Sequence, residues 1–566
     1  MGACRFFWPG GKGGGLPPLD GGRQFRNNPP WSFKDRREML HSPMARRGMV
    51  TSPHHLASQA GLAVLRDGGT AIEAAIAAAA ALTVVYPHMT GLGGDAFWLI
   101  AEPGKPPLSI DGSGAAGARV DAALYRDMAA VPTRGPLAAN TVAGAVSSWQ
   151  LALDVSAHWG GRLPLARLFA DAIAAARDGF AVSRHQAQAT GRGLAALKGQ
   201  PGFADHFLSR RKPPQPGAVM TRPALAATLE RLAAVGLDDF YRGEVGRSIA
   251  AGLAEAGSPL RAEDLARHRG MRRRPLSLGL PGATLFNTAP PTQGLASLIL
   301  LGLFQRLGVA EAEGFDHVHG LIESARIAQR IRDAHVSDPA RMSVHATTYL
   351  TDGMLDRLAG DIDRQRASAA SGAADPGDTV WLGVIDGHGR AVSLIQSLHH
   401  AFGSGVTLAE TGVTWHCRGA SFSLDPDHRN FLEPRRRPLH TLSPGLARLR
   451  DGRTMVYGTM GGDAQPIVQA QIFTRAALFG QGLQQAVSAP RWALGRAPDG
   501  GRAGGVQVES RLGAGIIGQL RQAGHAVEDV GEWNSLLGHA GALCRRADGM
   551  IEGAADPRSD GAVAGF

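Results

Sequence analysis

Thr379 stands between a loop-like segment and a predicted β-hairpin, where a threonine hydroxyl could act as a nucleophile. The residues before it, RASAASGAADPGD at 366–378, are small and polar with Pro and Gly, which is typical of a linker or surface loop. After it, two strand-like runs, TVWLGVID and RAVSLIQSL, flank the turn GHG. If the hairpin turns about Gly387–His388, Thr379 faces residues 396–397, which places the Ser397 hydroxyl beside it.

The chemistry of such a threonine depends on a base. A threonine hydroxyl is a weak nucleophile, and one recurrent base is the threonine's own α-amine. That amine exists only if the Asp378–Thr379 bond is cut, and its ordinary pKa of about 7.7–8 suits a general base. Threonine is also a common strand residue, so the hairpin and loop alone fit either a strand former or a self-cleaving nucleophile.

The segment TMGGD at 459–463 is a candidate oxyanion hole. It follows the strand-like run MVYG, and its glycines would let the backbone approach a substrate closely. Backbone N–H groups in such a turn can stabilise a developing negative charge. An ordinary Gly-Gly turn fits the same residues, so the segment by itself does not decide between the two.

The elements that must position these residues are a mixture of helices and strands. From Ser52 the apolar periodicity predicts two helices joined at a Gly-Gly pair, with Thr70 as N-cap of the second. The apolar run at 75–86 is shorter than the roughly 20 residues of a membrane span, which predicts a buried core helix. Residues 160–260 are mostly helical by periodicity, and the chain after the hairpin is rich in strands. We therefore predict an α/β (α+β) sandwich.

Composition and charge exclude several classes of protein. Residues 1–48 carry nine Lys or Arg against three Asp or Glu, so most of the net charge of +10 lies there, and aromatic residues do not interleave with the basic positions. Cys4, Cys417 and Cys544 form no CxxC pattern and predict neither a disulfide framework nor a zinc site. Residues 1–48 lack the apolar region of a secretory signal. We expect a cytoplasmic protein without nucleic-acid or membrane partners, in which residues 1–45 are a disordered leader or an over-called start.

The histidines near the hairpin do not predict a metal. His399, His400 and His416 have no carboxylate at ligand spacing, and neighbouring residues of a strand face opposite ways. We therefore expect no metal and no other cofactor.

Together the motifs resemble the gamma-glutamyltranspeptidase family of N-terminal-nucleophile hydrolases over residues 46–566. The resemblance rests on these segments in one order: RRGMVTSPHHLASQAGLAVLRDGGTAIEAAIAAAAALTVVYPHMTGLGGDAF, TVAGAVSSW, GRLPLARLF, FYRGEV, APPTQG, GDTVWLGVIDGHGRAVSLIQS, FGSGVTLAETG, RRRPLHTLSP, TMGGDAQP and GAADPRSDGAVAGF. It implies a four-layer αββα sandwich. It also implies cleavage into a large subunit, residues 46–378, and a small subunit, residues 379–566, that form a heterodimer or a dimer of heterodimers.

The resemblance also implies roles for particular residues. Thr379 would attack the carbonyl of Asp378 during maturation, and later the amide of the substrate. Gly461 and Gly462 fall on the family's oxyanion-hole pair. Ser397 replaces the family's second threonine and keeps a hydroxyl for the nucleophile.

The positions that recognise a glutamyl group in the family are changed here. Ser113 stands at about the place of the arginine that clamps the α-carboxylate, and Ser421 at that of the aspartate that binds the α-amino group. His399 replaces an asparagine, and His440 and Thr441 replace paired serines. Glutathione is therefore not the expected substrate.

Arg418, in WHCRGASFSLDP, stands among these changed positions. Its planar guanidinium matches a carboxylate bidentately, although most arginines are surface residues. The segments RGASFSLDP, RPLHTLSP and YGTMGG are similar to those of a subgroup of the family that contains an enzyme hydrolysing oxamate. We expect a small carboxylate-bearing amide as substrate, oxamate first. The alternatives are a gamma-glutamyl or glutaryl hydrolase or transferase, and an unprocessed relative that only binds.

Overall fold

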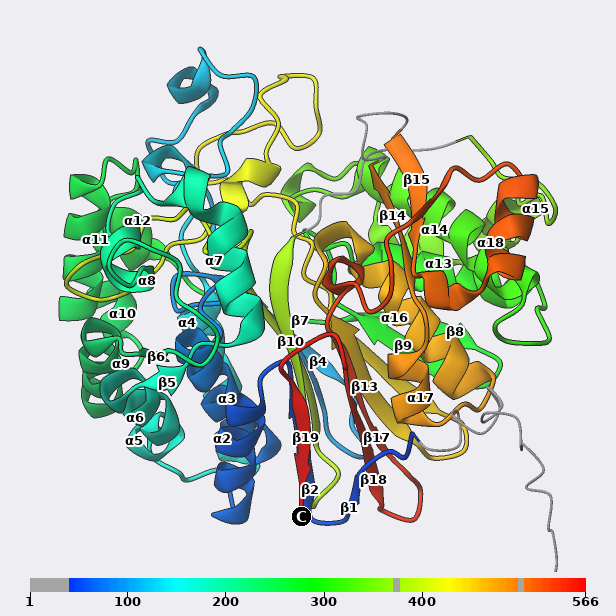
Figure 1. The fold of residues 1–566 in the computed structure, drawn as a ribbon, viewed down its shortest axis with the longest axis horizontal. Coiled ribbons are helices and arrows are strands. Elements are labelled where there is room, and N and C mark those ends of the chain that lie inside the picture. Colours follow the sequence, from blue (N-terminus) through cyan, green and yellow to red (C-terminus); the bar gives the residue numbers. More distant parts are fainter. Residues whose placement is uncertain (1–39, 370–376, 497–502) are drawn as a thin grey trace, which may run out of the picture. The chain divides into compact units, whose positions relative to one another are not determined.

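Two seven-stranded antiparallel sheets carry the site-forming strands of the computed structural model, which describes residues 40–369, 377–496 and 503–566 (Figure 1). The first sheet has the order β19 (Ala562–Gly565), β2 (Gly48–Ser52), β10 (Asp378–Asp386), β11 (Ala391–His399), β3 (Asp95–Ala101), β4 (Leu108–Gly112) and β7 (Met271–Arg273). The second has the order β1 (Met44–Ala45), β18 (Ile551–Ala555), β17 (Ala540–Arg545), β13 (Thr454–Thr459), β12 (Gly445–Leu449), β9 (Ala283–Asn287) and β8 (Leu276–Leu280).

Helices cover the outer face of each sheet, as Figure 1 shows. The first sheet packs on α2 (His55–Arg66), α3 (Ala71–Val85) and α4 (Ala145–His158). The helices α6 (Ala170–Asp178), α9 (Pro223–Val235) and α11 (Glu244–Glu255) belong to the same apolar cluster, in which α6 packs on α3 and α9 packs on α6. The second sheet packs on α13 (Gly294–Arg306), α16 (Gln465–Phe473) and α17 (Leu483–Ser488), and α14 (Phe315–His335) packs on α13 and α16. The expected four-layer αββα sandwich is therefore confirmed.

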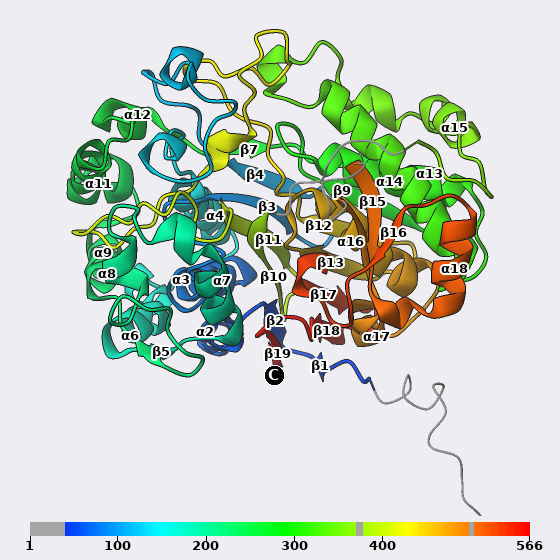
Figure 2. The same cartoon turned by 45° about the horizontal axis from the view of Figure 1, so that its top comes forward.

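The strand periodicity explains how β10 fits between two apolar layers. Val380 and Leu382 belong to the cluster beneath the helices, whereas Trp381 belongs to the cluster between the sheets. Figure 2 shows β10 and β11 stacked against β13 and β17 of the other sheet. A side chain at Gly458 of β13 or Gly541 of β17 would overlap the Trp381 ring, so these glycines make the close approach possible. Trp381 thus fixes β10 two residues after Thr379.

The helices predicted near the beginning of the fold are confirmed. Thr70 caps α3 as expected: its hydroxyl accepts from the Glu73 N–H at 3.2 Å, and the Glu73 carboxylate accepts from the Thr70 N–H at 2.7 Å. Every residue of α3 is buried, which matches the predicted core helix. Within the described residues, no helix combines the length and apolarity of a membrane-crossing segment.

The fold begins slightly before the predicted boundary. Met44–Ala45 pairs with β18, and the Ser42 hydroxyl accepts a hydrogen bond from Gln484 N–H at 3.0 Å. Strand pairing therefore already includes Met44 and Ala45, the last residues assigned to the leader. Most of the predicted leader, and residues 370–376 of the predicted linker, lie outside the described residues.

Candidate active site

Thr379 and Ser397 form a buried pair of hydroxyls on adjacent strands. The Thr379 side chain donates to Ser397 Oγ at 3.0 Å, and Thr379 is only 1% exposed. The register pairs Asp378 with His399 and Val380 with Gln396, and the irregularity between the two pairs falls at Thr379. The cross-strand neighbour deduced from the hairpin is thus the one observed.

Ser397 also contacts the peptide bond that precedes Thr379. Its hydroxyl donates to the Asp378 carbonyl oxygen at 2.6 Å and accepts from the His399 N–H at 2.7 Å. The Asp378 carboxylate accepts from the Ala401 N–H at 2.8 Å. The Asp378–Thr379 peptide is therefore held on both sides, with a hydroxyl donor on its carbonyl oxygen.

The glycine pair lies against the backbone just before this peptide. A Cβ built on Gly377 would be 3.1 Å from the Cα of Gly462. Gly461 and Gly462 have φ values of 121° and 52°, a backbone conformation that favours glycine. They follow β13 and precede α16. The two predicted elements, threonine and glycine turn, are thus brought together although 82 residues separate Thr379 from Gly461 in the sequence.

Gln293 fixes the glycine turn to the neighbouring segment. Its side-chain amide donates to the carbonyl oxygens of Gly462 and Thr441, each at 2.7 Å. Its own oxygen accepts from Arg332 at 2.9 Å, and Arg332 forms an ion pair with Asp463 at 2.6 Å. One buried amide therefore holds the position of Gly462 relative to Thr441.

Arg418 is buried beside the hydroxyls of Ser421 and Thr441. Arg418 is only 1% exposed, and its Nη1 donates to Ser421 Oγ at 3.4 Å and to Thr441 Oγ1 at 3.3 Å. Burial, with the nearby charge of Arg418, lowers the pKa of His440 to about 3. Arg418, Ser421, Thr441 and His440 therefore form one cluster with a cationic centre and a neutral imidazole.

Asp95 supports this cluster from β3. Its Oδ2 contacts His440 Nε2 at 3.0 Å and His416 Nδ1 at 3.4 Å, and its Oδ1 accepts from the N–H groups of Gly114 and Gly144. Burial would raise the pKa of the Asp95 carboxyl, but the two histidines hold it well below its usual range. Asp95 is thus a buried carboxylate that orients both imidazoles.

His399 lies beside the segment that contains Cys417 and Arg418. Its Nδ1 lies 3.2 Å from the Cys417 carbonyl oxygen, and Cys417 directly precedes Arg418. Ser113 does not join the Arg418 cluster through its hydroxyl, which donates to Asp111 at 2.6 Å. Apart from Ser113, the predicted site residues therefore lie in two neighbouring groups of the described chain, one around Thr379 and one around Arg418.

Comparison with known sequences agrees with this arrangement. Residues 57–566 match the sequence model of the gamma-glutamyltranspeptidase family. The chain belongs to the gamma-glutamyltranspeptidase family. It is accordingly an amide hydrolase of the N-terminal-nucleophile class, as the motifs implied.

Related proteins align with nearly the whole chain. An oxamate amidohydrolase proenzyme of Klebsiella pneumoniae is 50% identical over 93% of this chain and all of its own. A glutathione hydrolase-like proenzyme of Bacillus subtilis is 38% identical over 93% of this chain and all of its own. The crystal structure of a cephalosporin acylase from Bacillus halodurans superposes with a TM-score of 0.85 at 32% identity, covering 96% of this chain and 99% of the acylase.

Three of the residues that build this transpeptidase-family site were not identified by sequence reasoning. In the sequence, Asp95 and Gln293 appear only within the motifs GLGGDAF and APPTQG, and His416 is weighed only as a metal ligand. Each acts on a partner more than a hundred residues away. The sequence signal for these residues is that they lie in recognisable motifs. A motif singles out a residue, but it does not reveal which distant residue that residue contacts.

Acid should destabilise the fold through its buried neutral histidines. Because the pKa of His440 is about 3 when folded and about 6.5 in an unfolded chain, only the unfolded state binds its proton between these values. The stabilisation is complete above about pH 6.5 and decreases as the pH falls toward 3. At about pH 5 the free energy of unfolding is lower by about 2 kcal/mol than above pH 6.5.

Thermal unfolding scans between about pH 7.5 and pH 5 check this expectation. The midpoint should fall with pH, and His440→Asn should show a shallower fall because that variant has no imidazole to protonate. A midpoint that rises toward pH 5 would contradict the assignment of His440 as neutral.

Proposed function

We propose that the chain is a self-processing amidohydrolase that uses Thr379 first to cleave its own Asp378–Thr379 bond and then to hydrolyse a small carboxylate-bearing amide. The observation that carries the proposal is the pair of hydrogen bonds at Ser397. One joins its hydroxyl to Thr379 Oγ1 at 3.0 Å, and the other to the Asp378 carbonyl oxygen at 2.6 Å. Nucleophile and electrophile of the first reaction thus share one hydroxyl.

In maturation, Thr379 Oγ attacks the Asp378 carbonyl carbon. The C–N bond breaks as the C–O bond forms, and the hydroxyl proton is transferred to the threonine nitrogen, so that the acyl group moves from nitrogen to oxygen and the threonine amine is released. The Ser397 hydroxyl on the carbonyl oxygen stabilises the charge that develops there. Water then hydrolyses the ester, which leaves a carboxylate on Asp378 and an amine on Thr379.

The two subunits remain associated after this cut because they share both sheets. The small subunit, residues 379–566, supplies β10 and β11, and the large subunit, residues 46–378, supplies β2 and β3 on either side of them. The interface is therefore a continuous antiparallel sheet, which supports a stable heterodimer. No step of maturation requires these strands to separate.

In the mature enzyme, the free amine accepts the Thr379 hydroxyl proton as Oγ attacks the substrate carbonyl. The N–H groups of Gly461 and Gly462 stabilise the oxyanion. The proton then passes to the leaving nitrogen, which departs as ammonia, and an acyl ester remains on Thr379. A water molecule, deprotonated by the same amine, releases the acid.

Oxamate is the substrate we propose first. It carries a carboxylate directly beside its amide, and Arg418 with the hydroxyls of Ser421 and Thr441 offers donors for such an anion. Its lack of an amino group suits a cluster in which a serine stands where the family has an aspartate. The relative from Klebsiella pneumoniae, which bears the name of an oxamate amidohydrolase, supports the same choice.

Hydrolysis or transfer of larger acyl groups is the second candidate. It is favoured by the likeness to the cephalosporin acylase of Bacillus halodurans, which extends over 96% of this chain. Gamma-glutamyl and glutaryl amides are the substrates that would distinguish this activity.

A panel of amides tested on the processed protein separates the candidates. We expect ammonia release from oxamate with a kcat/KM at least about 10²-fold above that for glutamate release from glutathione. Glutaryl-7-aminocephalosporanic acid serves as the large acyl substrate. Faster turnover of glutathione or of the glutaryl amide would replace oxamate with the second candidate, without changing the nucleophile.

Replacing Ser397 tests its role in maturation. Ser397→Ala should slow self-cleavage by at least about 10-fold, because the Asp378 carbonyl oxygen and Thr379 Oγ both lose a partner. Ser397→Thr is the matched control, since it keeps the hydroxyl and should mature at close to the normal rate. A time course on a denaturing gel measures both, and equal rates in the two variants would exclude a role for the hydroxyl.

A further inference from the structure

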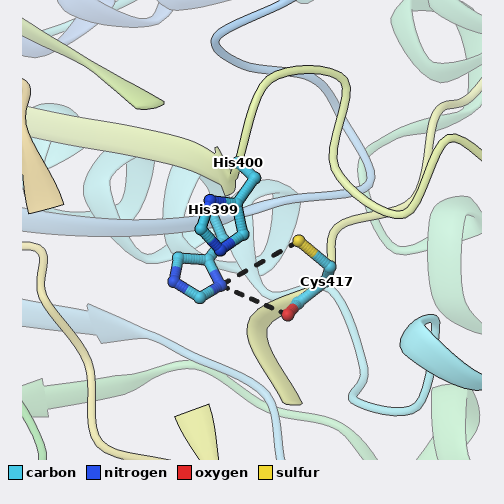
Figure 3. Close-up of side chains that lie close together, drawn as sticks. All are labelled: His399, His400 and Cys417. Atoms are coloured by element: carbon cyan, nitrogen blue, oxygen red, sulfur yellow. Dashed lines mark hydrogen bonds between the residues drawn. The ribbon is translucent and has the colours of Figure 1, made fainter. Parts of the chain in front are cut away.

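Two imidazoles and a thiol converge beside the proposed active site, in a group formed by His399, His400 and Cys417 (Figure 3). His399 Nδ1 lies 3.9 Å from Cys417 Sγ, and the two histidine rings have centroids 4.2 Å apart. One potential ligand atom from each residue lies within 4.8 Å of the others. We call this group the thiol–imidazole cluster.

The backbone at His399 explains why neighbouring histidines can share a site. The sequence argument against a metal assumed that they project to opposite faces of a strand. β11 ends at His399, where φ is 82°, so the alternation stops there. That part of the argument was wrong, and the two rings lie together at 34° to each other.

We propose that the thiol–imidazole cluster binds one divalent cation of the zinc class and that the bound metal inhibits the enzyme. Thiolate and imidazole are ligands that Zn²⁺ prefers, and three protein ligands leave a fourth position for water. Zinc bonds of about 2.0–2.3 Å require ligand atoms about 3.3–3.8 Å apart, so small side-chain movements suffice. On binding, Cys417 releases its thiol proton to solvent as the sulfur–metal bond forms.

A second group in the described part of the chain is a poorer candidate. His319, Glu323 and His525 also bring ligand atoms within 4.8 Å of one another. There, however, Glu323 is paired with Arg326 at 2.7 Å, and His319 Nδ1 lies 2.8 Å from His525 Nε2. A cation there would have to displace an arginine and break this imidazole pair.

Inhibition follows from the place of His399. Its N–H donates to Ser397 Oγ at 2.7 Å, and Cys417 directly precedes Arg418. A metal with its bound water would therefore lie next to both the proposed nucleophile and the proposed carboxylate site. Inhibition should compete with substrate, raising KM and leaving kcat unchanged; this part rests on the proposed function, whereas metal binding does not.

Cobalt titration of the processed protein tests the binding directly, because Co²⁺ bound to a thiolate has a charge-transfer absorption that needs no substrate. We expect one Co²⁺ per heterodimer with this band, displaced by Zn²⁺. Cys417→Ser should abolish the band and weaken Zn²⁺ binding by at least about 10-fold. The half-buried His400→Gln is a second variant whose affinity should fall while its fold, checked by circular dichroism, is unchanged. His525→Gln is the matched control and should bind normally.

Two results would overturn the proposal. One is a wild-type cobalt complex without the thiolate band, and the other is unaltered metal affinity in folded Cys417→Ser. If the metal binds with the thiolate band but KM for oxamate does not rise, the inhibitory role is wrong while the site stands. If no substrate is turned over at all, the proposed function has failed independently of the cobalt result.

Discussion

Thr379→Ala should yield a single uncleaved chain with no measurable amide hydrolysis. The alanine removes the hydroxyl that attacks the Asp378 carbonyl, so the α-amine that acts as base is never released. Loss of nucleophile and base together should reduce the rate by at least about 10³-fold. A denaturing gel measures the first effect, and ammonia release from oxamate measures the second.

Thr379→Ser is the matched control for this variant. Serine keeps the hydroxyl and the potential α-amine, so it should still mature, more slowly, and retain activity. The Ser397 hydroxyl lies 3.0 Å from Thr379 Oγ1 and would accept equally from a serine. Activity in Thr379→Ala comparable to that of the unaltered protein would instead favour the other alternative, a relative that does not process itself and works by binding.

Arg418→Gln should reduce kcat/KM for oxamate by about 10²-fold or more, mainly through KM. A hydrogen-bonded charge pair removed from a buried site costs about 2–5 kcal/mol, and Arg418 is only 1% exposed. The expected loss is specific for the carboxylate. Oxamide, which replaces that carboxylate with a second amide, should be hydrolysed equally by both proteins.

Arg418→Lys separates charge from geometry. Lysine keeps the positive charge but lacks the planar fork, so it should recover only part of the loss on oxamate. Equal losses on oxamate and oxamide in both variants would show that Arg418 supports the fold rather than the substrate carboxylate. The oxamate-to-oxamide ratio of kcat/KM is therefore the quantity to measure.

The local part of the candidate site could be predicted because it depends on short-range rules. Strand alternation and turn position are enough to pair two strands of one hairpin, and they placed Ser397 beside Thr379. Capping chemistry likewise placed the start of α3 at Thr70. The layer order came from the family resemblance, since periodicity gives the class of fold but not which sheets stack.

The contacts that needed the structure join segments far apart in the chain. Asp95 reaches His440 across 345 residues, and Gln293 reaches Gly462 across 169. No periodicity encodes such a pair, because its geometry depends on how two sheets pack. The close approach of His399 and His400 could not be predicted for a different reason. The positive φ of His399 ends the alternation of side chains along β11, and the sequence pattern does not show where this alternation stops.

N-terminal sequencing of the smaller chain tests the central claim most directly. Protein purified after complete maturation should separate into two chains under denaturing conditions, and the smaller should begin with Thr-Val-Trp-Leu at Thr379. Its intact mass should equal that of residues 379–566. A persistently intact chain, or a smaller chain that begins at any other residue, would contradict Thr379 as the nucleophile.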